Sequence, residues 1–299
     1  MKRLLIIGCG DVALRTIPLL TRRYRVFALV RNLTKCAKLR TMGVTPILGD
    51  LDHRASLTHI AGLADVVLHF APPSAGLGGE LARGRTSIDT RTRNLLSTLS
   101  QGRLPKQIVY ISTSGVYGDC AGAWVSETRP LKAVSARSLL RVDAEKQIRN
   151  WATRNQVHAS ILRVPGIYAA DRLPLDRLRI GTPAIVQAQD SYTNHIHADD
   201  LARIVIAALH NAKPNRVYHA SDDSELKMGD YFDVVADAHH LPRPPRLPRA
   251  EVERAVSPAL WSFMNESRRM TNARMKRELK VELRYPTIEE GLRFMSLAD

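Results

Sequence analysis

The stretch Leu4-Leu5-Ile6-Ile7-Gly8-Cys9-Gly10-Asp11-Val12-Ala13 decides the fold, because it joins an apolar strand to a helix through a glycine turn. Gly8 permits the tight turn, Gly10 lets the backbone approach a pyrophosphate, and Ala13 lets the helix pack closely on the strand. The free N–H groups at the start of the helix attract the anion. Since the pattern opens a unit of about 30 residues, it predicts a dinucleotide-binding βαβ unit. The alternative is a glycine turn without a ligand.

Short apolar runs alternate with amphipathic stretches through the first 165 residues. The runs expected to form strands are 3–7, 25–30, 45–48, 65–70, 107–112 and 159–164. The stretches expected to form helices are 13–20, 34–42, 57–61, 88–99 and 135–152. Runs rich in Val, Ile and Leu suit strands that are buried on both faces of a parallel sheet. The alternation predicts an α/β fold with a Rossmann-type, doubly wound parallel sheet.

The alternation loosens after residue 165, where proline- and arginine-containing stretches begin. We therefore expect a dinucleotide-binding domain over residues 1–165 and a mixed C-terminal part over residues 166–299. The second part should add the last strands and helices to the Rossmann domain. It should also form a small substrate-binding cap.

Composition narrows the class of protein. The net charge of +15 favours phosphate-bearing partners, or else reflects only a basic surface. The arginines are spread along the chain, which argues against nucleic acid as a partner without excluding it. Three scattered cysteines favour free thiols in a reducing cytoplasm. We expect no export signal, because the first apolar run is short, and no membrane span, because no run approaches about 20 apolar residues.

The end of the second predicted strand bears on the choice of cofactor. An NAD enzyme usually places Asp or Glu there, whereas this strand ends in Val30-Arg31-Asn32. Arg31 is a planar cation that can bind a 2′-phosphate, so we expect NADP(H) in preference to NAD(H). The alternative is a solvated arginine. Asp50 follows the third strand, where it could meet the adenine, and Pro72 lies in a turn that could border the cofactor.

Four ordered motifs carry a resemblance that spans almost the whole chain. They are the glycine turn, Asp50, the sequence Ile111-Ser112-Thr113-Ser114-Gly115-Val116-Tyr117-Gly118, and Asn194-His195-Ile196-His197-Ala198-Asp199-Asp200-Leu201-Ala202. The ending Tyr285-Pro286-Thr287-Ile288-Glu289-Glu290-Gly291-Leu292 agrees with them. The chain resembles extended short-chain dehydrogenases/reductases of the NAD-dependent epimerase/dehydratase type.

The resemblance implies a catalytic Ser or Thr, a Tyr that acts as general acid/base, and a Lys that holds the nicotinamide ribose. Thr113 falls on the hydroxyl position. Counting back from Glu145 places Arg141 at the Lys position and Arg137 at the Tyr position. Arginine does not deprotonate in proteins, so Arg137 cannot act as a phenol does. The chain therefore resembles the atypical subgroup that lacks the usual pair.

The resemblance also implies the cofactor contacts, and no metal is expected. The residues that we expect at the cofactor are Gly8, Gly10, Asp11, Val12, Arg31, Asp50, Leu51, Ala71, Pro72, Ser112, Arg141 and Pro165. His195 and His197 have the spacing of some metal ligands but lack further ligands in a recognisable pattern.

Two classes of function remain open. The first is an oxidoreductase or epimerase-like enzyme in which Thr113 orients a small anionic or nucleotide-linked substrate. Arg137 or Arg141 would bind its charge, unless the two arginines form a solvated face or pair with Asp143 or Glu145. The second is a non-catalytic NADP(H)-binding redox sensor or interaction protein, with RNA among its conceivable partners. A fold of this kind does not choose between them. We expect a monomer or a homodimer.

Overall fold

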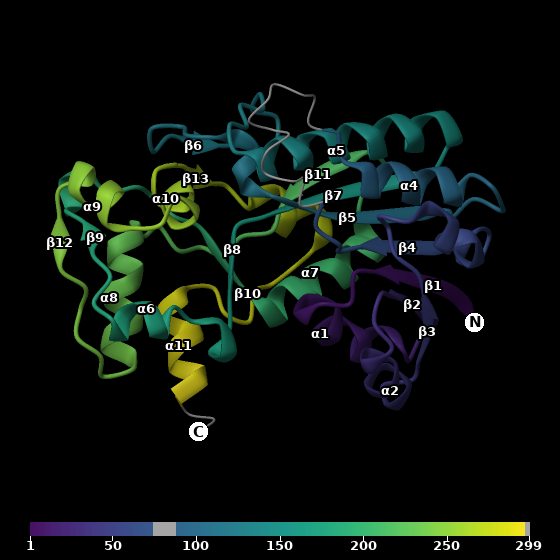
Figure 1. Cartoon of the computed structure of the whole chain (residues 1–299), viewed down its shortest axis with the longest axis horizontal. Helices are drawn as coiled ribbons and strands as arrows, with labels where there is room; N and C mark the ends of the chain where they lie inside the picture. The colour runs from purple at the N-terminus through teal and green to yellow at the C-terminus, as the bar shows by residue number, and fades with distance from the viewer. Residues whose placement is uncertain (74–87, 297–299) are drawn as a thin grey trace.

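A seven-stranded parallel sheet forms the centre of the computed structural model, which describes residues 1–73 and 88–296. Its order is β11-β7-β5-β4-β1-β2-β3 (Figure 1). The strands are β1 (Lys2–Ile7), β2 (Tyr24–Val30), β3 (Val44–Leu48), β4 (Val66–His69), β5 (Gln107–Thr113), β7 (His158–Val164) and β11 (Arg216–His219). The strand order reverses between β1 and β4, which confirms the doubly wound Rossmann-type fold and marks where a nucleotide binds.

Helices cover both faces of the sheet (Figure 1). One layer packs beneath β1 and β2, and its helices are α1 (Asp11–Leu20), α2 (Thr34–Thr41) and α7 (Ala198–Asn211). The other layer consists of α4 (Thr90–Leu99), α5 (Ala136–Asn155) and the 3-10 helix η1 (Arg54–Ile60). Side chains of a strand point alternately to the two faces of the sheet, and helices cover both faces. Leu4, Leu5, Ile6 and Ile7 of β1 are therefore all fully buried.

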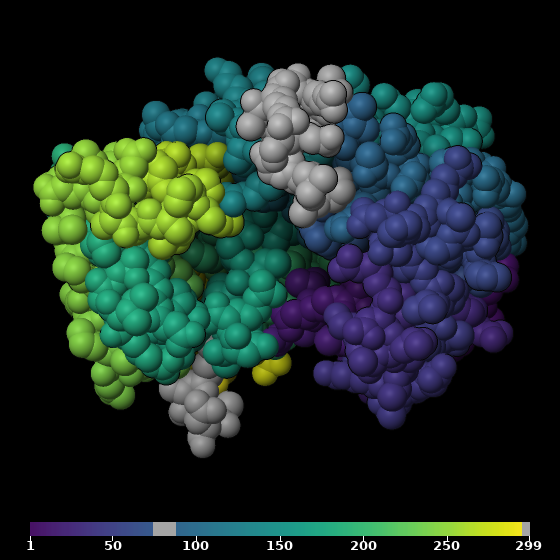
Figure 2. Space-filling model, in the orientation of Figure 1, coloured from purple at the N-terminus to yellow at the C-terminus, as the bar shows by residue number. Residues whose placement is uncertain are grey.

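The later elements form a smaller unit beside the sheet (Figure 1). Its helices are α6 (Leu175–Arg179), α8 (Met228–Ala238), α9 (Arg249–Ala255), α10 (Pro258–Met264) and α11 (Ile288–Ser296). Three short parallel pairs join them: β8 (Gly166–Tyr168) with β10 (His195–His197), β9 (Ala184–Ile185) with β12 (Arg246–Leu247), and β6 (Trp124–Val125) with β13 (Arg269–Met270). Figure 2 shows the surface hollowed where this unit meets the N-terminal part.

The expected strands all form, whereas some expected helices differ from the structure. The helix expected over 57–61 forms as the 3-10 helix η1, which begins earlier, at Arg54, and ends at Ile60. The helix expected over 135–152 continues to Asn155, and Gln156 ends it in the left-handed region at φ 55°. No helix in the described ranges is long and apolar enough to cross a membrane.

Candidate cofactor site

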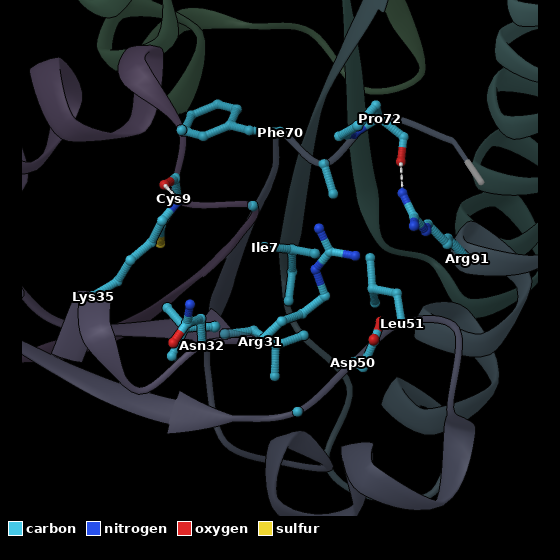
Figure 3. A pocket seen from close by; sticks show the side chains of 16 residues that line it. Ile7, Cys9, Arg31, Asn32, Lys35, Asp50, Leu51, Phe70, Pro72 and Arg91 are labelled. Carbon is cyan, nitrogen blue, oxygen red and sulfur yellow. Dashed lines mark hydrogen bonds between the residues drawn. The ribbon is translucent and has the colours of Figure 1, made fainter. Parts of the chain in front are cut away.

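A cavity of about 460 Å³ opens at the carboxyl ends of β1 to β4, where the strand order reverses (Figure 3). The structure brings together there seven of the residues expected at the cofactor. They are Gly8, Gly10, Arg31, Asp50, Leu51, Ala71 and Pro72. Residues that were not expected also line it, among them Cys9, Asn32, Lys35, Phe70 and Arg91.

The two glycines of the turn serve different purposes. Gly8 has φ +93°, and a Cβ placed on it would lie 2.5 Å from the backbone nitrogen of Ala71. Only glycine therefore lets the end of β1 pass this close to the end of β4. A Cβ on Gly10 would meet no heavy atom within 4 Å. Gly10 thus faces open space in the cavity, at the start of α1.

Two cations lie at the end of β2 and the start of α2. Arg31 is exposed, extends into the cavity in Figure 3, and forms no ion pair with any described residue. Lys35 lies four residues later and donates to the carbonyl oxygen of Cys9 at 3.5 Å. The same ammonium lowers the pKa of Cys9, but burial outweighs it and raises that pKa to about 11. The four-residue spacing from Arg31 is the one signal in the sequence that points to Lys35.

The opposite wall is held by an ion pair. The guanidinium of Arg91 donates to both oxygens of Asp52, at 2.8 and 2.6 Å, which lowers the pKa of Asp52. It also donates to the carbonyl oxygens of Pro72 and Pro73, at 3.3 and 3.2 Å. Arg91 therefore fixes the proline turn that borders the cavity, a role that only contacts across the fold can show.

The three catalytic candidates do not line this cavity. Thr113 ends β5, is partly exposed, and accepts a hydrogen bond from the backbone of Gly115 at 3.3 Å. Arg141 donates to the carbonyl oxygen of Ile111 at 2.7 Å and to the hydroxyl of Tyr110 at 2.9 Å.

Arg137 turns toward α10, where it lies 3.5 Å over the ring centre of Phe263 and donates to Ser262 O at 3.3 Å. Among the described residues, neither Arg137 nor Arg141 forms an ion pair with Asp143 or Glu145. The catalytic roles of Thr113, Arg137 and Arg141 stay predictions.

Ser112 belongs to a buried network of polar side chains. The Ser112 hydroxyl donates to Glu145 at 2.6 Å, and Arg163 pairs with both oxygens of Glu145, at 3.0 and 2.7 Å. Arg163 also donates to the Tyr117 hydroxyl, which lies 2.6 Å from His219 Nε2. Burial raises the pKa of Tyr117 to about 12 and lowers that of His219 to about 3. The Tyr117 phenol therefore keeps its proton at neutral pH.

The remaining expected cofactor residues lie outside the cavity lining. Asp11 forms ion pairs with Arg15 and Arg172. Val12 packs against the apolar core, and Pro165 is half-buried between β7 and β8. Their contacts with a cofactor stay predictions.

The two histidines of β10 are packed against aromatic rings. The ring centre of His195 lies 4.1 Å from that of Tyr231, and the ring centre of His197 lies 3.9 Å from that of Tyr285. Burial lowers the pKa of His195 to about 3. Within residues 1–73 and 88–296, no cluster of three or more His, Cys, Asp or Glu side chains could hold a metal ion.

Comparison with known proteins identifies the class to which this fold and turn belong. The model of the NAD dependent epimerase/dehydratase family matches residues 15–221. The chain belongs to this family. The family supports binding of a nicotinamide dinucleotide and an oxidoreductase or epimerase type of chemistry.

The individual proteins that the chain resembles share less than 30% of its sequence. A curated 4-hydroxy-2-methyl-3-oxo-4-farnesyl-3,4-dihydroquinoline-1-oxide ketoreductase from Stigmatella aurantiaca is 23% identical over 231 residues, which is 75% of this chain and 68% of the relative. A functionally unknown conserved protein from Silicibacter pomeroyi DSS is 28% identical, with TM-score 0.78 over 100% of this chain and 99% of the other. Human epimerase family protein SDR39U1, solved with NADPH, shares 16% identity and a TM-score of 0.75 over 99% of each chain.

Proposed function

We propose that the chain is an NADP(H)-dependent oxidoreductase that acts on a small anionic carbonyl or alcohol without the usual tyrosine–lysine pair. One observation carries the cofactor part of the proposal. Arg31 and Lys35 line the cavity where β2 ends, which is the place at which family members read the adenosine ribose.

Charge favours the phosphorylated cofactor. A 2′-phosphate adds negative charge to this ribose. Arg31 has no ion-pair partner among the described residues, so its guanidinium can bind the phosphate without breaking such a contact. An acidic residue at the end of β2, which would select the free 2′-hydroxyl of NAD(H), is replaced here by Arg31 and Asn32.

The chemical step rests on residues at the end of β5 and the start of α5. A bound nicotinamide cofactor would supply or accept the hydride, and the proton that balances it would be exchanged with solvent water. The Thr113 hydroxyl would hydrogen-bond the reacting oxygen, and Arg137 would hold an anionic group of the substrate. Arg141 would hold the nicotinamide ribose as a fixed cation. The name of the ketoreductase relative supports a carbonyl as the reacting group.

The test is consumption of NADPH with a panel of ketones that differ only in the presence of a carboxylate or phosphate. We expect turnover of the anionic ketones, and loss of most of it in Thr113→Val. Nucleotide-sugar epimerase and dehydratase assays should stay at background. Robust turnover of a nucleotide sugar by a tyrosine-dependent route would contradict the proposal.

A second candidate is a binding protein without turnover. It is favoured by the contacts of Arg141. The guanidinium of this residue donates to Ile111 O and to the Tyr110 hydroxyl, and Arg141 does not line the cavity. NADPH binding with no turnover of any ketone in the panel, and with Thr113→Val binding as tightly as the unmodified protein, would establish this alternative.

A further inference from the structure

A cluster of charged side chains surrounds Asp11, the first residue of α1. Its carboxylate accepts hydrogen bonds from Arg15 Nε and from Arg172 Nη1, each at 3.0 Å. Arg15 also pairs with Asp171 at 2.9 Å and with Asp199 at 2.8 Å. Asp171 and Arg172 belong to the short 3-10 helix η3 (Ala170–Arg172), which follows β8. The cluster therefore joins the glycine turn to the chain that leads into the C-terminal unit.

The position of Asp11 raises an electrostatic problem for a dinucleotide. Asp11 follows Gly10, which lines the cavity, and the first turn of α1 is where the N–H groups would meet a pyrophosphate. A carboxylate at this place repels a pyrophosphate unless a cation neutralises it. Since its side chain is 31% exposed, solvent screens it only in part.

The two arginines do not neutralise Asp11 equally. Arg15 divides its guanidinium among Asp11, Asp171 and Asp199. Arg172 pairs with Asp11 and with no other carboxylate among the described residues. Within the described chain, Arg172 therefore pairs with Asp11 alone, whereas Arg15 divides its charge among three carboxylates.

We propose that Arg172 is a positioning residue for the cofactor, which acts by neutralising Asp11 so that the pyrophosphate can bind at the start of α1. This inference rests on the proposed cofactor function and adds a residue 161 positions away along the chain from Asp11. It follows that the C-terminal part takes part in cofactor binding even though Arg172 does not line the cavity.

The experiment is calorimetric titration of NADPH and NADH into four variants at one ionic strength. Arg172→Gln should weaken both cofactors by the same factor, roughly fivefold to tenfold, because both carry the pyrophosphate. The double variant Asp11→Asn with Arg172→Gln should recover affinity to within about twofold of the unmodified protein. Asp11→Asn alone should bind at least as tightly as the unmodified protein. The matched control is Arg179→Gln, because Arg179 pairs with the nearby Asp176 and is exposed.

Two results would overturn the inference. One is unchanged affinity in Arg172→Gln, and the other is a double variant as weak as Arg172→Gln alone. Recovery in the double variant also excludes misfolding as the cause of the loss. The preference between NADPH and NADH should not change in any of these variants. A change confined to NADPH would assign Arg172 to the 2′-phosphate instead, whereas an unmodified protein that binds neither dinucleotide would refute the proposed function itself.

Discussion

At the scale of single residues, the cofactor site depends on a few side chains whose surroundings differ sharply. Arg31 reaches into the cavity without an ion-pair partner in the described chain, whereas Arg91 is committed to Asp52 and to the proline turn. A free guanidinium can gain a new contact with a phosphate, but a paired one would first have to lose its carboxylate. Under the proposed function, Arg31 would therefore bind the 2′-phosphate, with Lys35 as its neighbour.

Replacing Arg31 by Ala should weaken NADPH binding by about 1.5–3 kcal/mol and leave NADH binding nearly unchanged, since a charge-assisted contact is lost only with the phosphate. Lys35→Ala should act in the same direction with a smaller effect. Calorimetric titration measures both. Arg40→Ala, which alters an exposed cation on α2 outside the cavity lining, is the matched control. Equal losses for NADPH and NADH in Arg31→Ala would remove the residue from this role.

The two glycines of the turn should respond in opposite ways to replacement by alanine. Gly8→Ala places a Cβ against Ala71 at a positive φ, so we expect it to lower the free energy of unfolding by about 1–3 kcal/mol. Gly10→Ala meets only open space, so stability should change by less than about 0.5 kcal/mol while cofactor affinity falls. Urea denaturation and titration separate the two effects. A stable Gly8→Ala, or a Gly10→Ala with unaltered affinity, would contradict this division of roles.

At the scale of elements, the buried pair of Glu145 and Arg163 ties α5 to β7, and Ser112 ties it to β5. Glu145→Gln leaves the Arg163 charge buried and without its anion. The expected loss is about 3–5 kcal/mol of unfolding free energy, measured by urea denaturation. The neighbouring Lys146→Gln changes an exposed side chain and should have almost no effect. A loss below about 1 kcal/mol in Glu145→Gln would mean that apolar packing, and not this ion pair, holds α5 against the sheet.

At the scale of the whole molecule, His69, His195 and His219 are buried without charge, and burial lowers the pKa of each to about 3. In the unfolded chain they titrate near pH 6.5, so between about pH 6.5 and 3 the unfolded state binds more protons. These groups therefore contribute stability that is present above pH 6.5 and is lost as the pH falls. Each can add a slope of up to about 1.4 kcal/mol per pH unit.

Urea denaturation at a series of pH values measures this dependence. The unfolding free energy should fall steadily from pH 7 to pH 4, and His195→Gln should reduce the slope. His240→Gln, at an exposed histidine, should leave the slope unchanged and is the control. Burial raises the pKa of Asp190 and Asp222, which gives a slope of the opposite sign, so the comparison with His195→Gln decides. A His195→Gln variant with the slope of the unmodified protein would show that His195 does not stay neutral.

The parts that the sequence could predict are those encoded locally. Apolar runs and a glycine turn specify strands, a helix start and the strand that follows, so the sheet and seven of the cavity residues could be expected. Periodicity does not tell which distant side chains meet. Arg91 with Asp52, Arg172 with Asp11, and Arg137 with Phe263 are joined only by the fold, and for that reason no local pattern predicts them.

The most direct test of the central claim is the pair of dissociation constants of the unmodified protein for NADPH and NADH, measured by calorimetry in one buffer. We expect NADPH to bind at least about tenfold more tightly than NADH, which corresponds to about 1.4 kcal/mol. Equal affinity, or tighter binding of NADH, would contradict it.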